Sequence, residues 1–170
     1  FASRDQLVKQ IPSLKKKFPT YLAYRDVKLE DIINPVQRGN STSLKVQELR
    51  SVYLKNDSGT FSVHPLPIEA QYFPVFGIKA ADINEDGNLD VLLTGNLEAT
   101  QPDFGAYDSG TGLLLMGNGL GTFECVPGLQ SGFFTPGEGR DIESIRTRSN
   151  EVYYLVSRNN ATLIGFKKLK

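Results

Sequence analysis

The stretch Asp82-Ile-Asn-Glu-Asp-Gly-Asn-Leu-Asp90 is the most informative part of this sequence. It places acidic or amide residues at alternate positions of one short turn. Calcium takes roughly six to eight oxygen ligands, and a loop of this kind supplies them while its glycine permits the sharp turn. Here that glycine is Gly87, at position six. The sequence therefore predicts one Ca2+ site and no other metal site, with side-chain ligands at positions one, three, five and nine and a main-chain carbonyl at position seven: Asp82, Asn84, Asp86, Asp90 and Asn88. The alternative is a polar turn without an ion.

The residues after the loop distinguish between two kinds of calcium site. An EF-hand needs an acidic ligand at position twelve and a helix after the loop. Position twelve is Leu93, which lies in the apolar run of residues 89–94 that is typical of a strand. We therefore expect the loop to join two strands, residues 75–83 and 89–94, and neither an EF-hand nor a docking module built from paired helices is favoured.

Outward from the loop, alternating apolar residues predict a mainly β chain. Runs rich in valine, leucine and isoleucine are separated by Asn, Asp, Ser and Gly, which are typical turn residues. The predicted strands are residues 44–54, 60–63, 75–83, 89–94, 112–116, 122–126, 141–147, 151–157 and 161–167.

The N-terminal part has a different periodicity. Apolar residues recur there at spacings of three and four, which predicts helix over residues 3–35. Ser3 is placed to cap the first turn, Pro12 and Pro19 break the helix into short pieces, and Asn34-Pro35 is expected to end the last piece. The chain is thus expected to consist of an N-terminal helical segment, residues 1–43, and a β part, residues 44–170.

Two hairpin sequences repeat within the β part. Residues 56–61, Asn-Asp-Ser-Gly-Thr-Phe, match residues 118–123, Asn-Gly-Leu-Gly-Thr-Phe, and the segments that follow, 68–74 and 129–136, correspond loosely. The paired aromatic residues of those segments, Tyr72-Phe73 and Phe133-Phe134, are accordingly expected to serve packing. Repetition of small antiparallel sheets predicts a partial β-propeller of about two to three antiparallel blades.

Compared with a propeller template, the predicted strands make up the last two strands of one blade, one whole blade and three strands of another. Neither end completes a blade, which leaves unpaired strand edges. We therefore expect the chain, which starts at Phe1, to be a C-terminal fragment of a larger propeller. Alternatively, the N-terminal helices or another copy of the chain cover the edges.

The chain resembles the FG-GAP or VCBS repeats of calcium-binding β-propellers, such as the integrin α-subunit head and many bacterial surface proteins. The resemblance rests on the loop of residues 82–90 followed by Val91-Leu-Leu93 and on the paired hairpins 52–61 and 114–123, and it spans residues 44–168. It implies a structural calcium ion that braces the turn between two strands. Residues 3–18 look like the C-terminal region of large exported repeat proteins, which implies a periplasmic, cell-surface or extracellular location.

The next repeat departs from this pattern. Where it would carry its loop, the sequence reads Arg146-Thr-Arg-Ser-Asn-Glu151. Cations stand there in place of acids, and we expect no second calcium ion.

Charge and hydropathy narrow the classes of partner. Nineteen basic residues balance nineteen acidic ones, so no global positive field draws the chain to nucleic acid. No apolar run approaches the roughly 20 residues that a membrane-spanning helix needs, so no membrane span is expected. The single cysteine, Cys125, lies in a predicted strand and is expected to act as a small buried apolar residue.

Two functions remain open. The first is a calcium-stabilised binding or scaffold module of an exported repeat protein, with a protein or glycan ligand held by loops such as the polar loop 98–112. The alternative is a polysaccharide-acting hydrolase or lyase whose catalytic groups lie on propeller loops partly outside this chain. Glu138, Asp141 and Glu143, which lie near Arg140, are the acid/base candidates, but strand alternation places Asp141 and Glu143 on one solvated face. The only histidine, His64, has no nucleophile nearby and is expected to be structural.

Overall fold

The structure is a computed structural model that describes residues 2–168. The chain divides into two compact units, Phe1–Gln47 and Glu48–Lys170, and each is described by itself. The predicted outer limits of the two parts, residues 1 and 170, lie outside the described residues.

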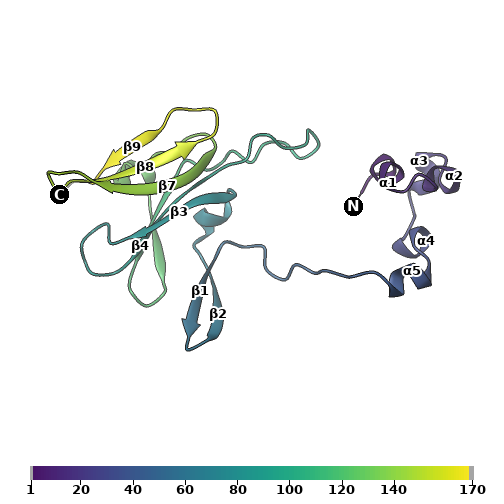
Figure 1. Ribbon diagram of the computed structural model, residues 1–170, viewed down its shortest axis with the longest axis horizontal. Helices are drawn as coiled ribbons and strands as arrows, with labels where there is room; N and C mark the ends of the chain where they lie inside the picture. The colour runs from purple at the N-terminus through teal and green to yellow at the C-terminus, as the bar shows by residue number, and fades with distance from the viewer. Residues whose placement is uncertain (1, 169–170) are drawn as a thin grey trace. The chain divides into compact units, whose positions relative to one another are not determined.

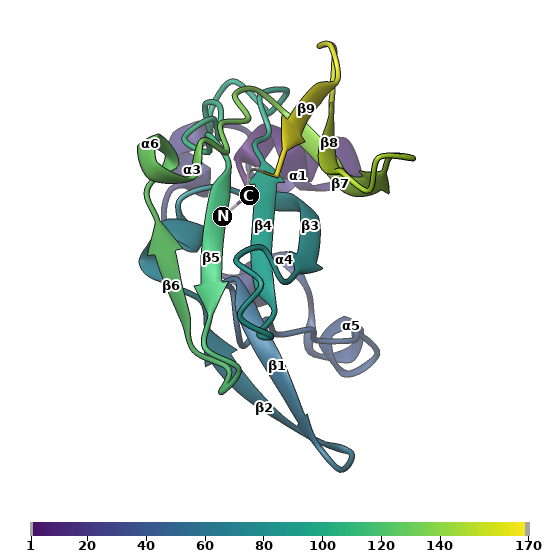
Figure 2. The same ribbon diagram turned by 90° about the vertical axis from the view of Figure 1, so that its left-hand side faces the viewer.

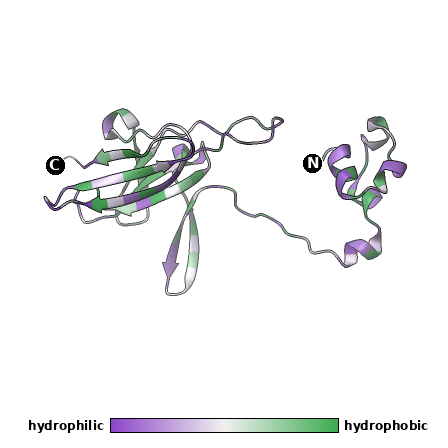
Figure 3. Cartoon of the chain, turned by 45° about the horizontal axis from the view of Figure 1, so that its top comes forward, coloured by the Kyte–Doolittle hydropathy of each residue, from purple (hydrophilic) through white to green (hydrophobic). Residues whose placement is uncertain are grey.

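The first unit contains short helices separated by prolines and turns, and hydrophobic and hydrophilic stretches alternate along them (Figure 3). Ser3 caps the first helix as predicted: its Oγ accepts a hydrogen bond from Gln6 N at 3.3 Å, and Ser3 N donates to Gln6 Oε1 at 2.8 Å. The helices are α1 (Arg4–Gln10), α2 (Leu14–Lys17), α3 (Tyr21–Tyr24), α4 (Leu29–Ile32) and α5 (Pro35–Gly39).

The helical turn before Asn34-Pro35 ends there as predicted, since α4 stops at Ile32, but a further helix, not predicted from the sequence, follows it. Asn34 Oδ1 accepts a hydrogen bond from Gln37 N at 2.8 Å, so the asparagine caps a further helix, α5. Pro35 is tolerated in the first turn of this helix, because a backbone N–H at that position would lack an intrahelical partner in any case.

The second unit consists of three antiparallel sheets (Figure 1). The predicted mainly β class is confirmed, and so is the grouping of the strands into sets of two, four and three. Residues 2–168 do not themselves form a closed propeller ring. The sheets are β1 (Val52–Asp57) with β2 (Thr60–Pro65); β3 (Val75–Ala81), β4 (Asp90–Gly95), β5 (Leu113–Gly117) and β6 (Phe123–Val126); and β7 (Gly139–Arg146), β8 (Val152–Arg158) and β9 (Ile164–Lys167).

The first predicted strand is too long, because residues 44–51 are not in a strand and β1 begins at Val52. Leu44, Val46 and Leu49 do alternate with polar residues, yet their side chains are 91%, 70% and 89% exposed. A strand needs a neighbour to pair its backbone groups and a surface to cover its apolar side chains. Among the described residues, residues 44–50 pair with no strand and their apolar side chains are uncovered, so the pattern does not produce a strand there.

The central sheet, whose strands lie side by side in Figure 2, is covered on both faces. Leu92 and Leu93 are consecutive residues of β4, so they point to opposite faces, and both are almost fully buried. One face packs on the third sheet through Ile142, Tyr154 and Val156. The other face packs on the helical turn η1 (Ile68–Gln71) and on Phe73. Two apolar cores therefore position β4 and the loop that precedes it.

The sequence repeat is also a structural repeat. The hairpins β1–β2 and β5–β6 are each followed by one helical turn, η1 or α6 (Gly128–Ser131), and then by a buried phenylalanine, Phe73 or Phe133. The adjacent aromatic residues, Tyr72 and Phe134, are exposed. The predicted packing role therefore holds for one aromatic residue of each pair.

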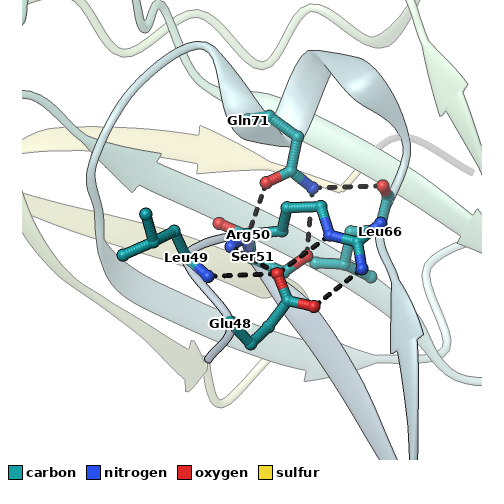
Figure 4. Close-up of polar contacts among 6 residues, drawn as sticks. All are labelled: Glu48, Leu49, Arg50, Ser51, Leu66 and Gln71. Atoms are coloured by element: carbon teal, nitrogen blue, oxygen red, sulfur yellow. Dashed lines mark hydrogen bonds and ion pairs between the residues drawn. The ribbon is translucent and has the colours of Figure 1, made fainter. Parts of the chain in front are cut away.

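Gln71 ties the end of η1 to the entry of β1 (Figure 4). Its Oε1 accepts a hydrogen bond from Ser51 N at 2.7 Å, and its Nε2 donates to Ser51 O at 3.0 Å and to Leu66 O at 3.1 Å. Beside it, hydrogen bonds from Arg50 lower the pKa of Glu48 to about 2. These contacts define the start of the β unit.

The central and third sheets are in close contact at Thr94 of β4. A Cβ atom on Gly139 would lie 1.9 Å from Thr94 Oγ1, and one on Gly77 would lie 2.7 Å from Thr94 Cγ2. The Thr94 hydroxyl is also within hydrogen-bond distance of the Thr135 hydroxyl, at 2.9 Å. The lack of a side chain at Gly77 and Gly139 thus leaves room for the side chain of Thr94 between β3 and β7.

Candidate metal centre

The acidic loop connects β3 to β4 at one end of the central sheet, as the sequence predicts. Ala81 pairs with Asp90 at the base of the loop. Within it, Glu85 and Gly87 have φ angles of 64° and 88°, and the glycine adopts this left-handed conformation without strain. The loop therefore reverses the chain within a few residues and turns its polar side chains toward its own backbone.

Asp82 organises the first half of the loop. Its Oδ1 accepts a hydrogen bond from Asp86 N at 3.1 Å, and its Oδ2 accepts one from Gly87 N at 3.0 Å. Asn84 Oδ1 also accepts from Asp86 N, at 3.1 Å. The predicted ligands at positions one and three are thus already folded inward around the backbone of positions five and six.

Asp86 is held by two donors. Asn88 N donates to its Oδ1, and Asn84 Nδ2 donates to its Oδ2, each at 2.8 Å. These hydrogen bonds, with that from Asn88 N the larger cause, hold the pKa of Asp86 below its ordinary value. The side chain is therefore ionised at neutral pH, which is the state that binds a cation.

Asp90 differs from the other predicted ligands because its side chain is fully buried. Its Oδ2 accepts a hydrogen bond from Ile83 N at 2.8 Å, and its Oδ1 accepts one from Gly117 N at 2.9 Å. The carboxylate thus closes the loop at its base and ties it to the end of β5. The sequence predicts Asp90 as a ligand, whereas its contact with Gly117 spans 27 positions and has no local signal.

The donor set fits calcium in its chemistry. The loop offers three carboxylates, one amide oxygen and one main-chain carbonyl, all hard oxygen ligands, and a carboxylate oxygen that accepts one hydrogen bond retains acceptor capacity. Within residues 2–168, no three His, Cys, Asp or Glu side chains are gathered closely enough to hold a metal ion. Binding therefore requires the carboxylates of the loop to draw together and the Asn84 amide to present its oxygen in place of its nitrogen.

A polar cavity of about 700 Å³ lies between this loop and the turn from β7 to β8. Two ion pairs line it: Lys168 Nζ lies 2.8 Å from Glu85 Oε1, and Lys167 Nζ lies 2.6 Å from Glu151 Oε1. Lys168, the residue that follows β9, therefore contacts the acidic loop. The residues around the cavity are Ala81, Asp82, Glu85, Ser144, Arg146, Ser149, Asn150, Glu151, Val152, Tyr154, Lys167 and Lys168.

The turn from β7 to β8 occupies the position that the repeat gives to a second loop. It is shorter than the acidic loop, and Arg146 Nη1 donates a hydrogen bond to Asn150 Oδ1 at 2.9 Å. Thr147 N donates to Glu151 O at 2.9 Å and closes the turn. The positively charged side chain of Arg146 thus contacts Asn150 across this turn.

Two of the acid/base candidates, Asp141 and Glu143, have separate hydrogen-bond or ion-pair partners. Asp141 Oδ1 accepts a hydrogen bond from the adjacent Ile142 N at 2.8 Å, while Glu143 forms an ion pair with Lys79 at 2.6 Å. Both residues are exposed, as strand alternation predicts. His64 is exposed as well, with Nε2 3.0 Å from Ser62 Oγ. Cys125 is partly buried, and burial raises the pKa of its thiol.

The third acid/base candidate, Glu138, is a buried carboxylate beside the start of β7. Its carboxylate accepts hydrogen bonds from Glu98 N at 2.7 Å and from Asn159 Nδ2 at 2.6 Å, and Arg140 lies 3.0 Å away. The side chain is 6% exposed. Arg140 is a local partner, whereas Glu98 and Asn159 come from two distant segments, so the local sequence indicates only part of the cluster. The cluster links the polar loop 98–112 to the third sheet.

Glu138→Gln should flatten the acid side of the stability profile. The hydrogen bond from Asn159, followed by that from Glu98 N, holds the pKa of Glu138 below its ordinary value. A carboxyl of this kind contributes stability above its unfolded-state pKa, and the contribution is lost as pH falls through the lower folded-state pKa. Melting temperatures measured between about pH 6 and pH 3 should therefore fall less steeply for Glu138→Gln than for the unchanged chain. Glu124→Gln, at an exposed position of β6, is the matched control; equal slopes for all three proteins would contradict the role of Glu138.

Among the described residues, no helix has the length and apolar character needed to cross a membrane. Comparison of the chain with family models, curated proteins and solved structures finds no match.

Proposed function

We propose that this chain is a calcium-stabilised binding or scaffold module of the FG-GAP or VCBS type, in which the ion is structural. The observation that carries the proposal is the loop of residues 82–90: acidic side chains turn inward, and Asp90 closes the base from a buried position. An ion at this point joins the end of β3 to the start of β4. Its effect is on stability, because the predicted ligands all come from one turn and the ion braces the two strands that the turn joins.

The three sheets are, in this proposal, successive blades of a partial β-propeller. Two observations support this interpretation: the central sheet packs face to face with the third sheet, and the order of hairpin, helical turn, buried phenylalanine and strand recurs along the chain. The remaining strands come from a larger propeller or from another copy of the chain. Such a module belongs to an exported protein, at the cell surface, in the periplasm or outside the cell. Its loops form the surface that binds a protein or glycan ligand.

Calcium should bind the chelator-stripped chain and raise its melting temperature. At a calcium concentration 100 times the dissociation constant, binding to the folded state alone adds about 2.7 kcal/mol to the free energy of unfolding. Asp86→Ala removes an exposed carboxylate from the centre of the loop and should weaken binding at least about tenfold by calorimetry. Asp103→Ala, in the exposed part of the loop 98–112, should leave the affinity unchanged.

The proposal fails if calorimetry detects no binding and the melting temperature is the same in calcium and in chelator. It also fails if Asp86→Ala and Asp103→Ala bind calcium equally, because the ion would then be held elsewhere. Magnesium at equal concentration provides a second comparison, since it requires stricter octahedral geometry and releases its waters reluctantly.

A further inference from the structure

One face of the hairpin β7–β8 lines the polar cavity beside the acidic loop. In the pairing of the two strands, Ser144 lies opposite Tyr154 and Arg146 lies opposite Val152. Residues opposite each other, and every second residue along a strand, point to the same face of a sheet. All four residues line the cavity, so three polar side chains meet it from one rigid face.

The hydroxyl of Tyr154 reaches the cavity without a hydrogen-bond partner. Tyr154 is only 6% exposed, and its ring belongs to the core that joins the central and third sheets. Within residues 2–168 the hydroxyl forms no hydrogen bond, yet none of their buried side-chain nitrogen or oxygen atoms lacks a partner. The hydroxyl is therefore open to a cavity that Tyr154 lines. Burial raises the pKa of this hydroxyl, against the opposing charges of Lys168 and Arg146, so it keeps its proton and can donate.

The acidic side chains of the cavity already have donors. Glu85 is paired with Lys168 and Glu151 with Lys167. Asp82 accepts hydrogen bonds from two backbone N–H groups of its own loop. The carboxylates around the cavity therefore have partners inside the chain.

The donors of the cavity are only partly used. Arg146 donates from Nη1 to Asn150, and among the described residues its guanidinium has no acidic partner. The hydroxyls of Ser144 and Tyr154 have no hydrogen-bond partner in the same part of the chain. A ligand that fits these groups brings acceptor oxygens, and a negative charge on it complements Arg146.

Size and polarity narrow the class of ligand further. The cavity has a volume of about 700 Å³, within the roughly 300–1,000 Å³ of typical ligand sites, and a bare anion would occupy little of it. Of the described residues that line it, only Ala81 and Val152 are aliphatic, while Ser149 and Asn150 add a hydroxyl and an amide at the turn. This lining suits a ligand with many hydroxyl groups better than an apolar one.

We propose that this cavity binds a carboxylated sugar, whose carboxylate accepts hydrogen bonds from Arg146 and Tyr154 and whose hydroxyls face the turn from β7 to β8. The planar guanidinium matches the geometry of a carboxylate. The inference rests on the binding role proposed above and names the class of its ligand. It places that ligand beside the acidic loop, whereas the polar loop 98–112 follows the other end of β4.

A titration of the isotope-labelled, calcium-free chain with D-glucuronate, followed by NMR, tests the inference. The amide signals of residues 144–154 should shift saturably. D-glucose, which lacks the carboxylate, should cause no such shift at equal concentration. Acetate, a carboxylate without the sugar, should bind at least about tenfold more weakly, because it leaves the hydroxyl and amide groups of the turn without contacts.

Tyr154→Phe removes the hydroxyl and keeps the ring in the core, and it should weaken D-glucuronate binding at least about threefold. Tyr153→Phe is the matched control, because it makes the same change on the opposite face of β8, outside the residues that line the cavity. Arg146→Gln should weaken binding at least about tenfold, whereas Arg148→Gln, at an exposed position of the turn, should bind within about twofold of the unchanged chain. Circular dichroism and melting temperature establish that the variants fold.

Absence of a saturable shift with D-glucuronate would overturn the inference. Equal affinity for acetate would reduce the site to one for a bare anion, and equal affinity for D-glucose would show that the carboxylate is not recognised; either result contradicts it. Equal effects within both matched pairs of variants would place the sugar elsewhere. Calcium binding is measured without the sugar, so a failure here is distinguishable from a failure of the calcium-stabilised module.

Discussion

Asp90→Ala should lower the free energy of unfolding by roughly 2–5 kcal/mol, even without calcium, because it leaves two buried backbone N–H groups without acceptors. These are the N–H groups of Ile83 and Gly117, which donate to the two oxygens of the carboxylate. Urea denaturation in chelator measures the change. With a metal ion absent from both samples, the loss reports only the contacts inside the chain.

The matched control is Asp86→Ala, which removes a predicted ligand whose carboxylate is exposed. In chelator this variant should lose much less stability than Asp90→Ala, whereas in calcium both should lose the stabilisation that the ion provides. Equal, small losses for the two variants in chelator would show that Asp90 contributes only as a ligand. Asp90→Asn should fall between them, since its amide keeps one acceptor oxygen and replaces the other with a donor.

Gly139→Ala should destabilise the β unit by roughly 1–3 kcal/mol, because the added methyl has no room between the second and third sheets. Its Cβ would lie 1.9 Å from Thr94 Oγ1 and 2.8 Å from Thr94 Cβ, so both strands must move. Gly128→Ala is the matched control, because its Cβ would meet nothing within 4 Å. Thermal and urea denaturation of the two variants compare the same chemical change at a crowded and at an open position.

The double variant Thr94→Ala with Gly139→Ala tests whether the contact is the cause. If the methyl added at position 139 clashes with Thr94, the two changes together should cost less than the sum of their separate effects. Additive losses would place the strain elsewhere in the sheet. Equal stability of Gly139→Ala and Gly128→Ala would show that the sheets accommodate the methyl without cost.

Much of the β unit follows from local sequence. Alternation and turn residues predict the strands from residue 60 onward, and the repeat of the Asn-x-x-Gly-Thr-Phe hairpin predicts their grouping. These features succeed because turns and half-buried strands are encoded by neighbouring residues. Residues 44–51 show where this reasoning fails: the alternation is present, but strand formation depends on a partner that lies outside the local sequence.

The candidate site is predicted only in part. The order of acidic residues in the loop indicates the ligands, whereas the burial of Asp90 depends on Gly117, in another strand. Glu138 likewise depends on partners from the loop 98–112 and from Asn159. Each of these features results from contacts between distant segments, which composition and periodicity do not encode.

The burial of Asp90 has a consequence for how the central sheet aligns its strands. Strand β4 is apolar toward both faces, since Val91, Leu92 and Leu93 follow one another, so sliding it by one residue would exchange one apolar set for another. Apolar patterning specifies strand alignment only weakly in such a case. A slipped strand would carry the carboxylate away from both of its donors and leave a charge in the interior. A slipped alignment of β4 is therefore less stable than the observed one, because Asp90 would lose both hydrogen bonds. The observed alignment fixes the position of the acidic loop at the end of the sheet.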